Sequence, residues 1–291
     1  MSKFALLLLS IVIALTCTVS GGAQNPPAPL PLTIEKVAQD LYVVRGEAGN
    51  TTVLVTDEGV LLVDVKFDRN YDDLMAKVKS VTDKPVKYVI NTHSHGDHTG
   101  GNPKFSSSVI IIAHKNARAA MIQAKQAGPP QITYTNQFAL NVGGKEVVGR
   151  YFGPAHTDGD TWVFFPALRV LSSGDSFTTA NGQGLNPTHS PTYGFIIAPG
   201  GSFAEITKTL DKVLKEDFDA VIPGHGPVGT KADVIRWRNE IEKLRNRMIE
   251  MVSSGKTKEE IQKMLVSEFG WDPMGNPLRN VDNLINELKR R

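Results

Sequence analysis

Short apolar, β-branched runs alternate with turn residues in the first third of the chain. Leucine and valine at positions 74, 78 and 81 then share one helical face, which predicts a helix over about 69–80. Gly49-Asn50 between two of the runs is typical of a turn. The order strand, helix, strand indicates a parallel strand pair in a buried sheet. The runs predict strands at 41–44, 52–55, 60–64 and 86–90.

The second half repeats this alternation and ends in helical patterns. Amphipathic spacing predicts helices over 202–215 and 232–252, and Thr257-x-x-Glu260 is a capping box that opens another helix. A last helix is expected over 282–290. No period of 20–50 residues is visible, which excludes a solenoid. Further strands are predicted at 109–113, 147–151, 161–165, 170–172 and 220–222.

The first residues have the layout of an export signal. Lys3 precedes an apolar run over 4–19, and the small residues Gly21-Gly22-Ala23 suit cleavage. The run is short for a membrane span, which needs roughly 20 apolar residues, although an uncleaved anchor stays open. We therefore expect a signal peptide over 1–23, a proline-rich linker over 24–32, and a secreted or periplasmic protein without stable membrane association after cleavage.

Composition narrows the chemistry that the mature chain can perform. Cys17, the one cysteine in the sequence, falls inside the expected signal, so neither a disulfide framework nor a thiolate nucleophile is available. The net charge of +2 offers no large basic field for phosphates, which argues against nucleic acid as the main partner, and a small-molecule substrate is expected. With 41% hydrophobic residues the chain has the composition of a folded globular protein.

Three histidines and an aspartate crowd a short segment directly after the predicted strand 86–90: His93, His95, Asp97 and His98. Histidine is a common metal ligand, and residues i and i+2 of an extended segment point the same way, so His93 and His95 can bind one ion. A turn at Gly96 directs Asp97 and His98 to a neighbouring position. Two ions roughly 3.5–4 Å apart are the usual geometry of a two-metal hydrolytic site.

Further metal-ligating residues stand at other predicted strand ends, each beside glycine. These are His156, Asp175 and His225. Together with the 93–98 segment, the sequence resembles the metallo-β-lactamase superfamily over roughly residues 33–230, since His93-x-His95-x-Asp97-His98 is the signature of that family and the later ligands appear in its order.

The resemblance implies a role for each of these residues. His93, His95 and His156 are similar to the ligands of a first zinc ion, Asp97, His98 and His225 to those of a second, and Asp175 to the carboxylate that bridges both. Asp64 matches an early aspartate of the family that supports a ligating loop. The implied fold is α/β, a four-layer αβ/βα sandwich with two mixed β-sheets and helices on the outer faces, over 33–230. The helices of 231–291 are expected to pack on the same domain.

The implied activity is that of an exported di-zinc hydrolase. A metal-bound hydroxide would cleave an amide or ester bond of a small molecule, with Asp97 also orienting the hydroxide and passing a proton to the leaving group. True β-lactamases of the superfamily usually carry cysteine or serine where this chain has Asp175. A bridging aspartate is more similar to the glyoxalase II, lactonase and phosphodiesterase branches, whereas export favours substrates such as β-lactams.

Several alternatives stay open from the sequence. The same ligand types accept iron, so an iron oxidoreductase of the persulfide dioxygenase type is a rival, and a phosphodiesterase is another. His189 and Tyr193 either line the substrate pocket or belong to a solvated loop, whereas His114 is expected to be structural. The native metal, the natural substrate and the oligomeric state are not fixed by the sequence.

Overall fold

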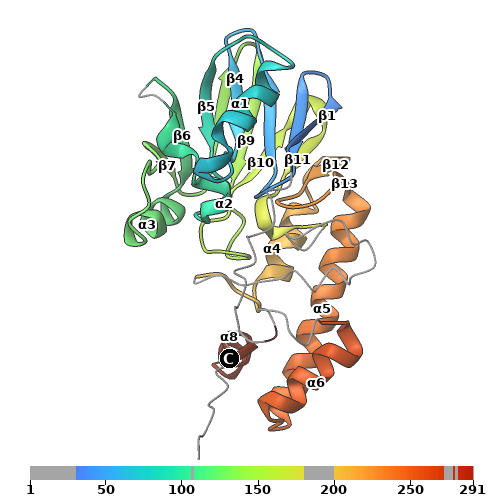
Figure 1. The fold of residues 1–291 in the computed structure, drawn as a ribbon. Helices are drawn as coiled ribbons and strands as arrows, with labels where there is room; N and C mark the ends of the chain where they lie inside the picture. The colour runs from blue at the N-terminus through green and yellow to red at the C-terminus, as the bar shows by residue number, and fades with distance from the viewer. Residues whose placement is uncertain (1–30, 106–107, 180–199, 272–277, 279–280, 291) are drawn as a thin grey trace, which may run out of the picture.

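Two β-sheets packed face to face form the centre of the computed structural model, which describes residues 31–105, 108–179, 200–271, 278 and 281–290. The first sheet has seven strands in the order β1-β2-β3-β4-β5-β6-β7, and the second has six in the order β13-β12-β11-β10-β9-β8 (Figure 1). The strands of the first sheet are Thr33–Ala38, Leu41–Arg45, Thr51–Val55, Val60–Val63, Val86–Ile90, Ile110–His114 and Ile132–Tyr134. The second sheet contains β8 to β13, at Gln137–Val142, Lys145–Arg150, Trp162–Phe165, Val170–Ser172, Ala220–Ile222 and Gly229–Thr230.

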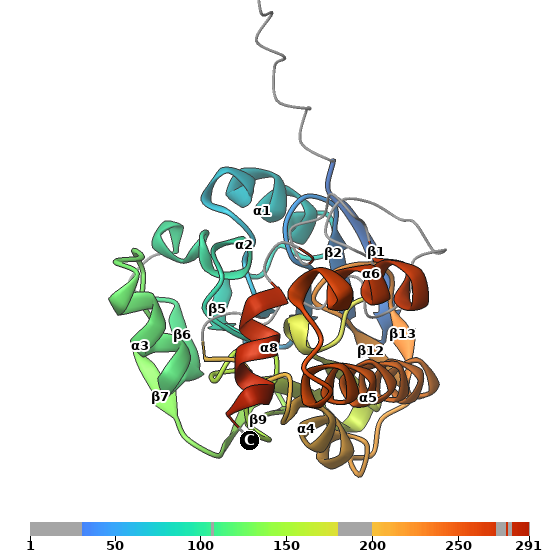
Figure 2. The same ribbon diagram turned by 90° about the horizontal axis from the view of Figure 1, so that it is seen from below.

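Helices cover the outer faces of both sheets. The first half contributes η1 (Asp68–Asn70), α1 (Tyr71–Lys79), α2 (Gly96–Thr99), η2 (Asn102–Lys104) and α3 (Lys115–Gln123). The second half contributes η3 (Pro166–Leu168), η4 (Gly174–Ser176), α4 (Ile206–Val213), α5 (Lys231–Ser253), α6 (Lys258–Phe269) and α8 (Val281–Lys289). Figure 2 shows α4, α5, α6 and α8 gathered on the near side of the molecule, with α1 and α3 on other sides.

Alternation along the strands produces three apolar layers. In β4, Leu61 and Val63 face the core between the sheets, whereas Val60 and Leu62 face the layer beneath α1. In β10, Val163 and Phe165 join the core between the sheets, and Trp162 and Phe164 face α4 and α5. Because both faces of each sheet are buried, the predicted four-layer αβ/βα arrangement is confirmed.

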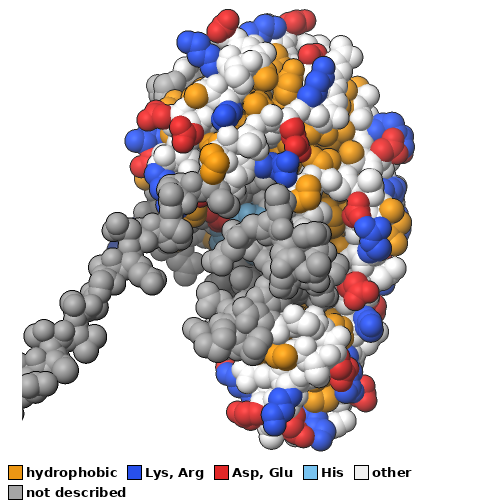
Figure 3. All heavy atoms as spheres, turned by 45° about the vertical axis from the view of Figure 1, so that its right-hand side comes forward, with side chains coloured by type: hydrophobic (Ala, Val, Ile, Leu, Met, Phe, Trp, Pro, Cys, Tyr) orange, Lys and Arg blue, Asp and Glu red, His pale blue; other side chains and the backbone are white. Residues whose placement is uncertain are grey.

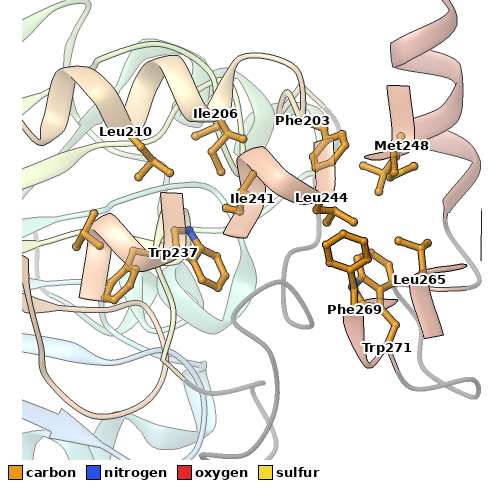
Figure 4. Close-up of a cluster of buried hydrophobic side chains, with 14 of the residues drawn as sticks. Phe203, Ile206, Leu210, Trp237, Ile241, Leu244, Met248, Leu265, Phe269 and Trp271 are labelled. Atoms are coloured by element: carbon orange, nitrogen blue, oxygen red, sulfur yellow. The ribbon is translucent and has the colours of Figure 1, made fainter. Parts of the chain in front are cut away.

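The third apolar layer joins the second sheet to the C-terminal helices. Figure 4 shows side chains of α4, α5 and α6 converging in it, among them Ile206, Trp237, Leu244 and Phe269. Trp237 and Leu244 are almost fully buried. Burying a side chain of this size contributes about 1.5–3 kcal/mol, so the long helix α5 is held chiefly by its apolar face.

The capping box is present at the N-terminus of α6, where the Thr257 side chain accepts from Glu260 N and Glu260 bonds back to the Thr257 backbone. The predicted helix over 202–215 is shorter in the structure and begins at Ile206. A side chain from α8 holds the turn that precedes α4. The Glu287 carboxylate accepts hydrogen bonds from Phe203 N and Ser202 Oγ at 2.9 and 2.5 Å.

The predicted parallel pair is confirmed, since β4 and β5 are parallel. In the second sheet β11 and β12 are parallel, and β9 runs in the same direction because both β9 and β11 are antiparallel to β10. The carboxyl ends of these strands therefore meet at one edge of the sandwich. Within the described part of the chain, no helix combines the length and apolar character needed to cross a membrane.

Candidate metal centre

Four segments at the strand ends of this edge carry all seven predicted ligands, and a fifth carries Asp64. The 91–98 segment follows β5, the loop with His156 joins β9 to β10, Asp175 lies in η4 after β11, and His225 follows β12. Asp64 directly follows β4. Figure 3 shows histidine side chains reaching the surface in a hollow of the molecule.

His93, His95, His156 and Asp175 form a first group whose ligand atoms all lie within 4.8 Å of one another. His95 Nδ1 and His156 Nε2 are 3.0 Å apart. Two nitrogens bound to one tetrahedral zinc ion at about 2.0–2.1 Å lie about 3.3 Å apart. The spacing of the first group therefore fits one cation.

Asp97, His98, His225 and Asp175 form a second group within the same 4.8 Å limit. Asp97 Oδ2 lies 3.2 Å from His225 Nε2 and 3.5 Å from His98 Nε2. These spacings also fit ligands of one cation. The two groups contain the residues that the resemblance assigned to a first and a second zinc ion.

Asp175 is common to both groups and turns one carboxylate oxygen to each. Its Oδ1 lies 3.1 Å from His98 Nε2 and 3.4 Å from His225 Nε2 in the second group. Its Oδ2 lies 3.7 Å from His156 Nε2 and 4.0 Å from His93 Nε2 in the first. This is the orientation that a carboxylate bridging two cations requires.

The hydrogen bonds around Asp64 fix which ring nitrogen of two histidines carries the proton. Asp64 Oδ2 is 2.8 Å from His98 Nδ1, so Nδ1 carries a proton and Nε2 is the nitrogen left to bind a cation. Thr92 Oγ1 donates to Asp64 Oδ2 at 2.7 Å, and its single hydrogen is thereby used. His93 Nδ1, 3.0 Å from Thr92 Oγ1, must then be the donor, which leaves a lone pair on His93 Nε2.

Three buried atoms of the site have no hydrogen-bond partner among the described residues: His93 Nε2, His98 Nε2 and Asp175 Oδ1. All three belong to residues predicted as ligands, and each can offer a lone pair to a cation, His98 Nε2 by giving up the proton that Asp175 favours. Unpaired buried polar atoms are rare because each costs about 1–3 kcal/mol. Lone pairs of imidazole and carboxylate converging on one place are satisfied by a cation, so the residues fit the metal ions that the resemblance implies.

The carboxylates give the second group a negative potential. Burial would lower the pKa of His98, but the charges of Asp175 and Asp64 outweigh it and raise the pKa well above its usual value. Asp175 likewise overcomes burial and raises the pKa of His225 to about 9. In His93 burial dominates and lowers the pKa well below its usual value. Positive charge is therefore favoured most strongly at the second group.

Two residues that support the site were missed in the sequence. Asp160 was given no role, yet its buried carboxylate accepts hydrogen bonds from Thr157 N and Ser176 Oγ. It thereby joins the loop of His156 to that of Asp175. Asn50 was interpreted as a turn residue, and its contacts lie with the His225 loop, 173 residues away. Nothing local in the sequence indicates either contact.

The remaining candidates have simpler outcomes. His114, expected to be structural, is buried, and its Nε2 lies 2.9 Å from Thr135 O while its ring stacks on Tyr151. His189 and Tyr193 lie outside the described residues, as does the expected signal peptide.

Two known proteins are similar to this chain over about two thirds of its length. A metallo-beta-lactamase type 2 from Bacillus sp. (strain 170) is 29% identical over 202 residues, covering 67% of this chain and 74% of that protein. The 2,4-dinitroanisole O-demethylase subunit alpha of Nocardioides sp. (strain JS1661) is 27% identical over 202 residues, covering 67% of this chain and 57% of its own length.

The fold is shared with solved structures. A metallo-beta-lactamase from Pontibacter korlensis superposes with a TM-score of 0.62 at 18% identity, covering 72% of this chain and 99% of that one. The family model described as the metallo-beta-lactamase superfamily matches residues 44–225, which include all seven residues of the two groups. With the two-sheet fold and the paired ligand groups, this match shows that the chain belongs to the metallo-beta-lactamase superfamily.

Proposed function

We propose that this protein is an exported hydrolase that uses two zinc ions to cleave an amide or ester bond of a small molecule. Membership of the superfamily suggests a metal-dependent hydrolase. The observation that carries the two-ion proposal is Asp175, whose two carboxylate oxygens face separate groups of ligand atoms. A site for a single ion would give the second group no purpose.

The chemistry divides between the ions and the chain. Two zinc ions held by the two groups would supply a water of lowered pKa and positive charge for the oxygen that becomes negative during attack. Asp97 has a quarter of its side chain exposed, whereas His98 beside it is fully buried. Its carboxylate can therefore reach a substrate, orient the attacking water, take a proton from that water, and pass the same proton to the leaving group.

Three considerations guide the choice of substrates to test. The aspartate at 175 is more similar to the lactonase-type branches, and export would bring the enzyme to substrates outside the cytosol, β-lactams among them. One relative is named as an O-demethylase, so an aryl methyl ether belongs among the test substrates. We favour a lactone or a β-lactam.

A substrate panel tests the proposal. Zinc-loaded protein is assayed on a β-lactam, a lactone, a thioester, a phosphodiester and an aryl methyl ether. We expect turnover of the lactone or the β-lactam, loss of turnover with a chelator, and loss in His98→Ala. Full activity in purified His98→Ala would refute the assignment, and turnover of the phosphodiester alone would make the protein a phosphodiesterase.

Metal analysis separates zinc from iron. The first group, three imidazoles and a carboxylate, also accepts iron, which is the basis of the rival oxidoreductase of the persulfide dioxygenase type. Protein produced without added metal should contain close to two zinc ions per chain. One tightly bound iron together with oxygen consumption would favour the rival.

Export has its own test. We expect expression in a bacterial host to deliver the protein to the periplasm or medium, and its N-terminal sequence to begin near residue 24. Recovery only from the membrane fraction with Met1 retained would instead indicate an anchor.

A further inference from the structure

The segment Gly49–Asn50, between β2 and β3 of the first sheet, contacts the second ligand group from behind. Gly49 N donates to Asp97 O at 3.1 Å. A Cβ added to Gly49 would lie 2.3 Å from His98 Cε1, so the glycine backbone packs directly against that ring. Glycine is required here because any side chain would displace His98.

Asn50 makes the connection to His225. Its Nδ2 donates one hydrogen bond to Pro223 O and another to Gly226 O, both at 2.9 Å. Its backbone N donates to Gly224 O at 2.7 Å. Both hydrogens of the amide are thus used, and the three acceptors stand on either side of His225.

The segment itself is firmly held. Lys66, a fully buried lysine, donates to Gly49 O at 2.6 Å and to Glu47 O at 3.1 Å. Glu47 in turn accepts a hydrogen bond from Arg69 Nη2 at 2.6 Å. A rigid support is what a residue needs if it is to fix the geometry of a ligand on another sheet.

The first group has a different support. The described contacts of Gly49 and Asn50 reach Asp97, His98 and the His225 turn, which are parts of the second group. The loop of His156 is instead connected through Asp160. The two groups can therefore be perturbed separately.

We propose that Asn50 is a positioning residue that sets the affinity of the second ligand group for its cation by holding the His225 turn against Asp97 and His98. The inference rests on the proposed two-ion function. Asn50 touches no ligand side chain in the contacts described, and it acts through the backbone on both sides of His225. Removing its amide should leave the turn folded, because Gly224 N still donates to Gly174 O at 2.8 Å.

The test measures stepwise metal binding in Asn50→Ala and in the milder Asn50→Ser. Zinc is titrated into metal-free full chain by calorimetry and by competition with a chromophoric chelator, and Co²⁺ absorption reports the coordination of each site. We expect the second dissociation constant to rise about 10–100-fold and the first to change less than about threefold. The serine variant, which keeps one donor, should fall between alanine and wild type.

Asn102→Ala is the matched control. Asn102 is also buried, and its Nδ2 also donates two hydrogen bonds, to Asn91 Oδ1 and Gly128 O. It should lose stability without a selective loss of the second ion. Thermal unfolding of each metal-free variant separates weakened binding from loss of folding.

The outcomes are distinguishable. A wild-type chain that binds a single ion refutes the two-ion proposal, and this inference with it. A wild type that binds two ions, with unchanged steps in both Asn50 variants, refutes the inference alone. An equal loss of both ions in the two variants, or a selective loss of the second ion in Asn102→Ala, also overturns it.

Discussion

Replacing Asp64 with asparagine should weaken both cation sites at once. The carboxylate is buried and accepts three hydrogen bonds, from Thr92 N at 2.8 Å, Thr92 Oγ1 at 2.7 Å and His98 Nδ1 at 2.8 Å. Asparagine keeps the shape of the side chain but offers one acceptor oxygen. Asp64 has a left-handed backbone with φ +61°, which asparagine tolerates and alanine does not. The change therefore perturbs hydrogen bonding with little backbone strain.

The size of the loss in metal affinity follows from the hydrogen-bond donors that lose their acceptor in Asp64→Asn. With one oxygen replaced by NH₂, at least one of the three buried donors faces another donor, at a cost of about 1–3 kcal/mol. Partners of this kind alter metal affinity by about 10–100-fold, or about 1.4–2.8 kcal/mol. His98 is contacted directly and His93 through Thr92. We expect both dissociation constants to rise, with the larger rise for the second ion.

The assay is stepwise zinc binding against a chromophoric chelator, with urea unfolding of the metal-free protein beside it. Asp219→Asn is a suitable control, because that carboxylate is exposed and pairs with Arg169 at the surface. If Asp64→Asn bound both ions within about twofold of wild type while remaining folded, the assigned role of Asp64 would be wrong. A selective loss at the first ion would contradict the hydrogen-bond directions derived above.

Three other predictions concern the support of the site and its metals. Asp160→Asn should lower the free energy of unfolding by about 1–3 kcal/mol in urea titrations, because buried donors of Thr157 and Ser176 lose an acceptor; an unchanged midpoint would contradict this. Burial lowers the pKa of Lys66 from 10.5 to about 7, so between these values the unfolded chain binds more protons and the free energy of unfolding should rise with pH, by up to about 1.4 kcal/mol per unit. Lys66→Met should lack this rise between pH 7 and 9, and parallel curves for the two proteins would refute it. Free zinc at about 100 times its dissociation constant should stabilise the fold by about 2.7 kcal/mol per site, and a melting temperature indifferent to a chelator would argue against metal binding.

The central strands were predictable because their apolar, β-branched residues are the ones that the packed sheets bury. The strands β3 and β4 are buried along almost their whole length, and continuous apolar β-branched runs are typical of such strands. The first strand, β1 (Thr33–Ala38), was not predicted, since it lies at the sheet edge and none of its residues is fully buried. β8 (Gln137–Val142), at the edge of the other sheet, was also missed, because Val142 is its one buried residue.

The candidate ligands could be singled out in the sequence because they are clustered or stand beside glycines at strand ends, and metal-ligating residue types in that arrangement are unusual. Their supports were not. Asn50 and Asp160 are ordinary polar residues whose roles arise from loops that meet only after the sheets pack. The true start of α4 depends on Glu287, whose acceptor oxygens come from a helix more than 80 residues away.

The two sheets divide the sequence cleanly, since the first ends with β7 at Tyr134 and the second begins with β8 at Gln137. Each ligand group nevertheless draws histidines from both sides of that boundary. Neither the residues before 135 nor those after 136 contain all the members of either ligand group. A protease cut at 135–136 would thus yield two fragments that bind zinc tightly only while they remain associated. The amount of zinc retained after the cut would therefore report whether the two fragments stay together.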